Sequence, residues 1–324
     1  MTYSRIVGTG RYLPERVITN FDLEKMVDTS DEWIRTRSGI ERRHAVADDE
    51  TTSDMCVEAA KVAIEDAGID VTDIDMVAIG TTSPDLVFPN IATLVQHRLG
   101  IPACPTIAME AACTGFIYAL STVDKFMRAG ESRCALVIGA EAITKIIDWN
   151  DRNTCVLFGD GAGAVIVKPS EEPGILTTKI RGDGQYKELL WYPAGVSKDL
   201  DLAGTDAEGM RITMVGNEVF KVAVKTLGNV AMEALESAGV SIDEVDWLIP
   251  HQANLRIIQA AAKRLDVPMD KVIVTVQDHG NTSAASIPLA LDVAIRDGRV
   301  KKGQTLLFAS FGGGFTWGSA LLRL

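Results

Sequence analysis

An internal repeat limits the folds open to this chain more than any other pattern in it. The segment AIEDAGIDVTDIDMVAI at 63–79 aligns without gaps with ALESAGVSIDEVDWLIP at 234–250, so Gly68 falls on Gly239, a spacing of 171 residues. In each copy the pattern predicts a helix that ends at Ala-Gly, then an acidic turn, then a buried strand. A repeated helix–turn–strand unit indicates two similar halves.

The rest of the chain has the pattern of an α/β protein. Short apolar runs of strand length alternate with helix-period segments, at 75–80, 134–140, 164–168 and 305–310. This alternation predicts layers of helices on sheets. No low-complexity linker divides the chain, and the segment at about 193–210 is expected to be a surface loop. We predict two α/β halves related by a pseudo-twofold axis, over 1–171 and 172–324, with the functional site at their junction.

Charge and composition narrow the classes of partner. The formal charge of −12 argues against nucleic acid or an anionic membrane as the main partner. No apolar run approaches the roughly 18 residues of a membrane helix, and the N-terminal residues lack a signal-peptide pattern, so a cytoplasmic location is expected. The five cysteines form no CxxC pair and no zinc spacing.

Cys113 has the sequence context of a nucleophile. The strand-like IAMEAA precedes it, and a small TGF and a helical run follow. Backbone N–H groups at a helix N-terminus favour a negative charge, which predicts a lowered thiol pKa. His251 in PHQAN and Asn281 in HGNTSA supply a base and an amide. Adding the repeat spacing of 171 residues to Cys113 gives Ala284, three residues beyond Asn281. The segments around Cys113 and Asn281 therefore occupy equivalent places in the two halves.

Three interpretations of these residues remain open on the residues alone. In a thiol hydrolase or thioesterase, the histidine would deprotonate the cysteine and the asparagine would orient the histidine. In a thioester condensing enzyme, the helix N-terminus would activate the cysteine, and the other two would serve a second substrate. The third interpretation is structural: a buried helix-start cysteine, a strand-end histidine and a turn asparagine.

The glycine-rich segment FGGGFTWG at 311–318 favours the condensing enzyme. It is too rich in glycine for an ordinary strand, which indicates a close backbone approach. A glycine amide there, paired with the Cys113 amide, would form an oxyanion hole. The context of a papain-type cysteine is not found around Cys113, so the hydrolase is less favoured.

At this level of detail the chain resembles β-ketoacyl-acyl carrier protein synthase III, a thiolase-like condensing enzyme family. The resemblance spans essentially all 324 residues. Nine segments carry it in order: GTGRYLPE at 8–15, TSDEWIRTRSGIERR at 29–43, AACTGF at 111–116, DRNT at 151–154, FGDGAGA at 158–164, GNEVFKVAV at 216–224, PHQANLRII at 250–258, HGNTSAAS at 279–286 and FGGGFTWGSAL at 311–321. It implies a thiolase-like fold with layers in the order αβαβα.

The resemblance implies a two-stage decarboxylative condensation. Cys113 would take the acyl group from an acyl-CoA, with the oxyanion on the amides of Cys113 and Gly313. Malonyl-acyl carrier protein would then bind, with His251 and Asn281 holding its thioester carbonyl as CO2 leaves. Phe220 would pack near the departing carboxylate. No metal or bound cofactor is expected.

The resemblance also implies binding residues. CoA would contact Trp33, Arg37, Arg152, Asn217 and Asn254. The acyl pocket would be lined by Phe88, Phe158, Leu190, Ile212 and Phe311. Phe88 would reach across a homodimer interface and shorten the partner's pocket, which predicts a preference for acetyl-CoA. The acidic carrier protein would meet a basic surface formed by Lys221, Lys225, Arg256, Lys263 and Arg264.

We therefore predict a homodimeric acyltransferase that starts fatty acid synthesis, with neither nucleic acid nor membrane as partner. Two alternatives are kept. One has the same fold but uses longer or branched acyl-CoA in secondary metabolism, and the other is the Cys-His-Asn thiol hydrolase or thioesterase.

Overall fold

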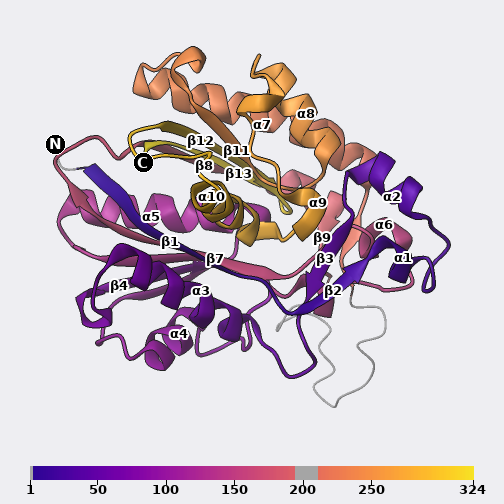
Figure 1. Cartoon of the computed structure of the whole chain (residues 1–324), viewed down its shortest axis with the longest axis horizontal. Helices are drawn as coiled ribbons and strands as arrows, with labels where there is room; N and C mark the ends of the chain where they lie inside the picture. Colours follow the sequence, from indigo (N-terminus) through magenta and orange to yellow (C-terminus); the bar gives the residue numbers. More distant parts are fainter. Residues whose placement is uncertain (1–2, 194–210) are drawn as a thin grey trace.

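The computed structural model describes residues 3–193 and 211–324, so the surface loop expected at about 193–210 lies, apart from its first residue, outside the described residues. The five-layer arrangement predicted for the fold is confirmed. Figure 1 shows, from top to bottom, helices, a sheet, helices, a second sheet and helices.

The lower sheet takes its strands from the first half of the chain: β1 (Tyr3–Tyr12), β4 (Met76–Gly80), β5 (Thr106–Met109), β6 (Ala135–Glu141) and β7 (Gly161–Ser170). Their order is β1-β7-β6-β4-β5. The inner strands β4 and β6 are buried along their whole length, which is why MVAIG and ALVIGAE are nearly all apolar.

The upper sheet takes its strands from the second half: β8 (Ile175–Gly182), β11 (Trp247–Pro250), β12 (Thr305–Gly312) and β13 (Thr316–Arg323). Their order is β11-β12-β13-β8. Read backwards, this order repeats that of β1, β7, β6 and β4, and the parallel and antiparallel pairings agree pair by pair. The two sheets are therefore built on one plan.

Six helices form the three helical layers: α3 (Thr52–Ala67) and α4 (Ile91–Leu99) below, α5 (Gly115–Ala129) and α10 (Ser286–Arg296) between the sheets, and α7 (Gly216–Ala238) and α8 (Leu255–Arg264) above. The central pair contacts both sheets and is apolar on most of its surface, because neither helix has a face turned fully to water. Phe116 of α5 and Leu291 of α10 pack there with Phe308 of β12.

Smaller elements gather at the right-hand side of Figure 1: β2 (Arg16–Thr19), α1 (Asn20–Leu23), α2 (Asp31–Ser38), β3 (Arg42–Ala45), α6 (Arg152–Cys155), β9 (Leu190–Trp191) and α9 (Val276–His279). They extend beyond the layered core on the side where the site lies. The short strand β10 (Thr213–Met214) pairs with β9. Among the described residues, no helix is long and apolar enough to cross a membrane.

The repeat read from the sequence has a structural counterpart at each step. Gly68 and Gly239 end α3 and α7 in left-handed conformations, with φ of 61° and 65°. The acidic turns that follow are 3-10 helices with capping boxes, over Val71–Asp73 and Ile242–Glu244. Another 3-10 pair, η2 (Ala112–Thr114) and η7 (Ser283–Ala285), precedes the two central helices at the same spacing of 171 residues.

Candidate active site

Cys113 lies in η2, just before α5, and the second half of the chain holds it in place. The Ser310 hydroxyl donates to the Cys113 carbonyl oxygen at 2.7 Å, and the Thr316 hydroxyl donates to the Ala111 carbonyl oxygen at 2.6 Å. A Cβ on Gly312 would lie 2.6 Å from the Cys113 nitrogen, so this approach requires glycine. The close backbone contact expected from FGGGFTWG is therefore present.

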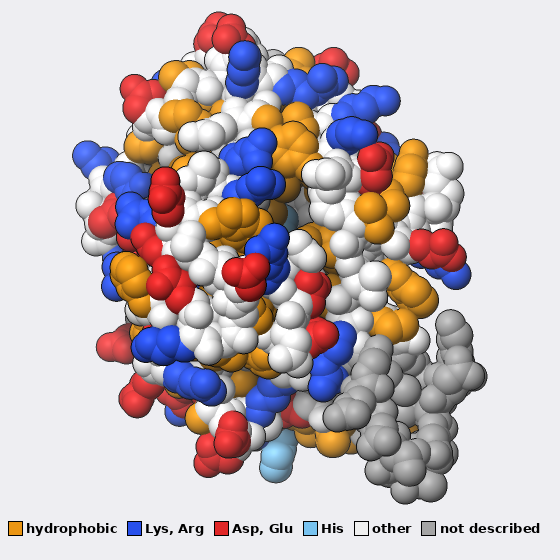
Figure 2. All heavy atoms as spheres, turned by 90° about the vertical axis from the view of Figure 1, so that its right-hand side faces the viewer, with side chains coloured by type: hydrophobic (Ala, Val, Ile, Leu, Met, Phe, Trp, Pro, Cys, Tyr) orange, Lys and Arg blue, Asp and Glu red, His pale blue; other side chains and the backbone are white. Residues whose placement is uncertain are grey.

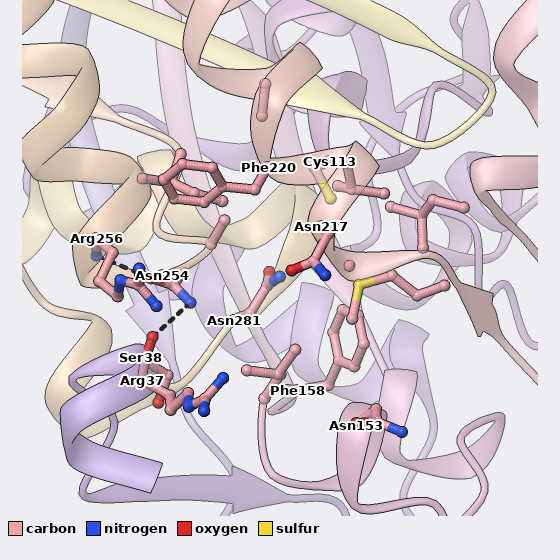
Figure 3. A pocket seen from close by; sticks show the side chains of 18 of the residues that line it. Arg37, Ser38, Cys113, Asn153, Phe158, Asn217, Phe220, Asn254, Arg256 and Asn281 are labelled. Carbon is pink, nitrogen blue, oxygen red and sulfur yellow. Dashed lines mark hydrogen bonds between the residues drawn. The ribbon is translucent and has the colours of Figure 1, made fainter. Parts of the chain in front are cut away.

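Two cavities meet at Cys113. The larger, of about 820 Å³, is also lined by His251 and Asn281, and Figure 3 shows part of its lining. The smaller, of about 340 Å³, lies toward Gly313 and Ile212. The cysteine thus has an open space on either side, and His251 and Asn281 line the larger one.

The predicted direction of the Cys113 pKa is wrong. Its side chain is buried, and burial raises the thiol pKa to about 12, although a hydrogen bond from Ser283 acts in the opposite direction. Loss of water destabilises the thiolate by more than the local donors recover. The thiol is therefore protonated at neutral pH, and its proton needs an acceptor when the sulfur attacks.

His251 follows β11 and is buried and neutral. Its backbone N–H donates to the Ala309 carbonyl oxygen at 2.8 Å, and its Nδ1 lies 2.7 Å from the Ser286 hydroxyl oxygen. Burial lowers the His251 pKa to about 3, so the ring stays uncharged across the physiological range. Since Nδ1 faces Ser286, the other ring nitrogen is the one left for a substrate.

Asn281 follows α9 and is fixed by its backbone and by its side-chain oxygen. Its N–H donates to the Leu157 carbonyl oxygen at 2.8 Å, and its carbonyl oxygen accepts from Gly159 at 3.0 Å. The side-chain oxygen accepts the Ser283 N–H at 2.9 Å. The amide nitrogen therefore remains as a donor, and Figure 3 shows the Asn281 side chain reaching into the cavity. No hydrogen bond joins Asn281 to His251 among those of the described residues.

Four of the five residues expected to contact CoA line the larger cavity: Trp33, Arg37, Asn217 and Asn254. Arg37 and Asn254 are joined by a hydrogen bond, in which the Asn254 side-chain N–H donates to the Arg37 carbonyl oxygen at 3.1 Å (Figure 3). Arg152 does not line this cavity, but its guanidinium lies over the Trp33 ring at 5.1 Å. The Arg37 guanidinium lies over the same ring at 5.3 Å.

The expected acyl-pocket residues divide into three groups. Phe158, Leu190 and Ile212 line the smaller cavity, and the first two line the larger cavity as well. Phe311 lines the larger cavity. Phe88 is 83% exposed and lies on a loop with the exposed Leu86 and Val87, so it does not close a cavity of its own chain. Glu110, three residues before Cys113, also lines the smaller cavity.

Two further predicted residues lie beside the nucleophile. Gly313, in the turn between β12 and β13, lines the smaller cavity with Cys113. Phe220 lies in the first turns of α7 and lines the larger one. The Arg256 guanidinium lies 5.8 Å from the Phe220 ring centre, so a positive charge lies beside this apolar wall.

The five predicted carrier-protein residues lie on two packed, exposed helices. Lys221 and Lys225 are on α7, and Arg256, Lys263 and Arg264 are on α8. In the described part of the chain, three of these charges have intramolecular contacts: Lys221 pairs with Glu218 at 2.8 Å, Arg264 donates to Asn229 at 2.8 Å, and Arg256 lies over the Phe220 ring. Figure 2 views the molecule from the right-hand side of Figure 1. Lys and Arg side chains lie in the upper part of the surface seen there, with fewer acidic side chains among them.

Three polar residues of the site were not singled out from the sequence. Ser286 contacts His251, Ser283 contacts Cys113, and Glu141 contacts Ser283. Both serines lie in the HGNTSAAS segment, but only the turn from η7 into α10 decides which hydroxyl faces which partner. A signal for Ser283 did exist, because the repeat spacing places it on Ala112, next to the nucleophile.

Comparisons with known proteins agree over the whole chain. Residues 107–184 match the family described as 3-Oxoacyl-[acyl-carrier-protein (ACP)] synthase III, and residues 235–324 match that family's C-terminal part. The chain is 59% identical to a Beta-ketoacyl-[acyl-carrier-protein] synthase III of Xanthomonas campestris pv. campestris, covering 99% of this chain and 98% of the relative. It is 57% identical to one from Thioalkalivibrio sulfidiphilus, covering all of both chains. The crystal structure of 3-oxoacyl-[acyl-carrier-protein] synthase III from Aquifex aeolicus VF5 has a TM-score of 0.93 and 47% identity, covering 99% of this chain and 100% of that one.

Proposed function

The chain belongs to the β-ketoacyl-acyl carrier protein synthase III family, and on this premise we propose that Cys113 carries the acyl group between the two stages of its reaction. That reaction is the initiating condensation of fatty acid synthesis. An acyl-CoA and malonyl-acyl carrier protein give a 3-oxoacyl-acyl carrier protein, CO2 and CoA.

The observation that carries the proposal is the place of Cys113 between the two cavities. A thioester arm in the larger cavity would bring its carbonyl to the sulfur, and the transferred acyl group would extend into the smaller one. The tetrahedral intermediate would place its oxyanion on the backbone amides of Cys113 and Gly313. Removing one such donor typically costs about 3 kcal/mol of transition-state stabilisation.

His251 and Asn281 would act in the second stage. Ser286 beside Nδ1 leaves the other ring nitrogen of His251 to donate, and the Asn281 amide nitrogen is a second donor into the same cavity. Two donors on the malonyl thioester carbonyl would hold the enolate charge as the bond to CO2 breaks. The enolate carbon then attacks the acyl carbonyl on Cys113, and the cysteine leaves as thiolate. Phe220 would face the malonyl carboxylate.

The geometry gives the hydrolase alternative no support. A Cys-His-Asn hydrolase needs the asparagine to orient the histidine. Here Ser286 contacts His251, and the Asn281 oxygen accepts the Ser283 N–H. The two side chains are thus anchored separately, as expected of two donors to one carbonyl.

CoA would lie along the larger cavity, with its adenine against Trp33 and its phosphates near Arg37. The Arg152 guanidinium lies over the indole ring of Trp33. With CoA bound, it would cover the face of the adenine that is turned away from the indole. Asn217 and Asn254 would bind the pantetheine arm. The carrier protein would bind α7 and α8 through the five basic residues named above.

The proposal includes a homodimer in which Phe88 of each copy shortens the other copy's acyl cavity. Its exposure of 83% fits a residue that a second copy covers. The smaller cavity, at about 340 Å³, exceeds the space of a two-carbon acyl group, so the expected preference for acetyl-CoA depends on that second copy. A cytoplasmic location, the absence of nucleic acid and membrane partners, and a reaction without metal or cofactor stay predictions.

Intact-protein mass spectrometry after incubation with acetyl-CoA tests the proposal. We expect one acetyl adduct on the wild-type protein, none on Cys113→Ala, and loss of the adduct when malonyl-acyl carrier protein is added. CoA release with no adduct would instead support a hydrolase. The alternative role in secondary metabolism predicts faster acylation by longer or branched acyl-CoA.

A further inference from the structure

A buried carboxylate lies one hydroxyl away from the nucleophile. Glu141, the last residue of β6, is fully buried. Its Oε1 lies 3.1 Å from the Ser283 hydroxyl oxygen, and that oxygen lies 3.4 Å from the Cys113 sulfur. The three side chains form a continuous chain from the thiol to the carboxylate, and they come from three different elements.

Ser283 has one hydroxyl proton for two acceptors, so the hydrogen bonds among Cys113, Ser283 and Glu141 can have two arrangements. With Glu141 ionised, Ser283 donates to the carboxylate and can accept from the thiol. With Glu141 protonated, the carboxyl can donate to Ser283, which then donates to the sulfur. The arrangements differ by the shift of one proton along each hydrogen bond, and they keep the total charge of the three groups constant.

The surroundings of Glu141 can hold either charge state. In the described part of the chain, its other hydrogen bonds come from the segment 81–83: from the Thr81 hydroxyl at 3.3 Å, the Thr82 N–H and hydroxyl at 3.1 Å each, and the Ser83 hydroxyl at 2.6 Å. These donors stabilise a carboxylate without a permanent positive charge. Burial outweighs them and raises the Glu141 pKa to about 7.

We propose that Glu141, acting through Ser283, accepts the Cys113 proton in the first stage of the reaction and returns it at the end of the cycle. The inference rests on the proposed function for the identity of the reacting thiol. Ser283 touches the sulfur and is the catalytic residue here, whereas Glu141 acts through it.

Each step balances in atoms and electrons. The S–H bond of Cys113 breaks, its proton passes to the Ser283 oxygen, and the Ser283 proton passes to Glu141. The sulfur electron pair forms the bond to the acyl carbon, and CoA leaves as a thiolate with the electron pair of the broken C–S bond. After the enolate attacks, Cys113 is expelled as a thiolate and recovers the proton from Glu141 through Ser283.

A neutral Glu141 would also benefit the second stage. The malonyl carboxylate and the enolate that follows are both anionic, and an ionised Glu141 nearby would repel them. With the proton stored on Glu141 while Cys113 is acylated, the site meets the second substrate without that extra negative charge.

His251 is less suited to the same task. Its Nδ1 faces Ser286, and burial opposes a positive charge on its ring, which lowers its pKa to about 3. Among the described residues, two thiols interact electrostatically with Glu141: Cys113 on η2 and Cys56 on α3. The Cys56 thiol is fully buried, and its pKa is raised well above its ordinary value, so it does not titrate near pH 7.

The pH dependence of Cys113 alkylation by iodoacetamide tests the relay without any thioester. Peptide mapping isolates Cys113 from the other four cysteines. We expect the wild-type rate to rise through an inflection near pH 7. In Ser283→Ala and in Glu141→Gln the rate at pH 7.5 should fall at least tenfold and the inflection should disappear. Ser319→Ala, which removes a buried serine hydroxyl bonded to Val230 away from the site, is the matched control and should keep the wild-type profile.

Folded Ser283→Ala and Glu141→Gln proteins with the wild-type alkylation profile would overturn the relay. So would a profile that loses its inflection only in His251→Ala. Because alkylation needs no acyl-CoA, failure of the proposed function would appear separately, as a missing acetyl adduct.

An infrared difference spectrum of the wild-type protein tests the stored proton directly. In a time-resolved spectrum at pH 7.5, acetylation of Cys113 should produce a protonated-carboxyl band that Glu141→Gln lacks and that decays as the proton exchanges with solvent. Acetylation without such a band in the wild-type protein would overturn the proposal, even if both variants fail to fold.

Discussion

The hydroxyl oxygen of Ser286 lies 2.7 Å from Nδ1 of His251, and this contact sets which ring nitrogen can donate. The Gln252 N–H donates to the same oxygen at 3.3 Å, so the Ser286 hydrogen can point at Nδ1. A neutral ring that accepts at Nδ1 carries its proton on Nε2. The contact therefore favours the tautomer that donates to a substrate carbonyl.

Ser286→Ala should weaken the decarboxylation stage most. Loss of one hydrogen bond, worth about 1 to 1.5 kcal/mol, predicts a roughly tenfold lower rate of malonyl-acyl carrier protein decarboxylation, measured in a Cys113→Ala background. Acetyl transfer to Cys113 should fall by less, and Ser286→Thr should restore much of the loss. Equal losses in both stages would contradict a tautomer effect.

Trp33→Ala should raise the KM for acetyl-CoA about tenfold, because the indole ring is the surface expected to stack with the adenine and has guanidinium groups at 5.1 and 5.3 Å. Acetyl-pantetheine, which lacks adenine, is the control substrate. Its steady-state KM should be the same for the variant and the wild-type protein. A parallel rise for both substrates would show that Trp33 is needed for the shape of the cavity and not for the adenine.

Charge reversal on α7 and α8 should weaken carrier-protein binding. For Lys225→Glu with Lys263→Glu, we expect at least a fivefold higher KM for malonyl-acyl carrier protein, roughly 1 kcal/mol, measured at low salt. The difference should shrink as salt rises. Lys302→Glu, in the exposed loop beside the C-terminus, is the control. If Lys302→Glu raises the KM for malonyl-acyl carrier protein equally, carrier-protein binding depends on the net charge of the enzyme and not on α7 and α8.

Glu141 should make stability fall as pH rises. Its folded pKa of about 7 lies above its ordinary 4.5, so between these values the folded protein binds a proton that the unfolded chain has lost. The unfolding free energy therefore decreases with rising pH across that interval, by about 3 kcal/mol in total. Urea unfolding at pH 5 and pH 8 should show most of this decrease in the wild-type protein relative to Glu141→Gln. Equal changes in both proteins would contradict the raised pKa.

Phe88→Ala should lengthen the accepted acyl chain if a second copy uses this side chain as a wall. The ratio of octanoyl-CoA to acetyl-CoA acylation rates should rise at least tenfold, measured by mass spectrometry of samples quenched at successive times. Leu86→Ala, on the same exposed loop, is the comparison and should change the ratio much less. A wild-type protein that already prefers octanoyl-CoA would show that the expected short pocket is wrong.

Much of the fold could be read from the sequence because the repeat is preserved in spacing. Gly68 and Gly239 end equivalent helices, and the strands that follow occupy equivalent places in the two sheets. The segments around Cys113, His251 and Asn281 were also identifiable, since their residue types and neighbours are unusual. All three line one cavity.

The rest depended on distances that the sequence does not contain. The Cys113 pKa was expected to fall at a helix N-terminus, but the depth of burial raises it. Glu141 was not singled out, because its buried environment comes from hydroxyls about 60 residues earlier and a serine 142 residues later.

The division of the site between the two halves has a consequence for refolding. Cys113 follows a strand of one sheet, whereas His251 follows a strand of the other, and Ser283 reaches the thiol from a sequence distance of 170 residues. Contacts so far apart in sequence form late, because a long loop must close before they contribute. The pairing of β1 with β7 joins Tyr3 to Ser170, a similar separation, so recovered acetyl transfer after dilution from denaturant reports closure of the sheets as well as docking of the halves.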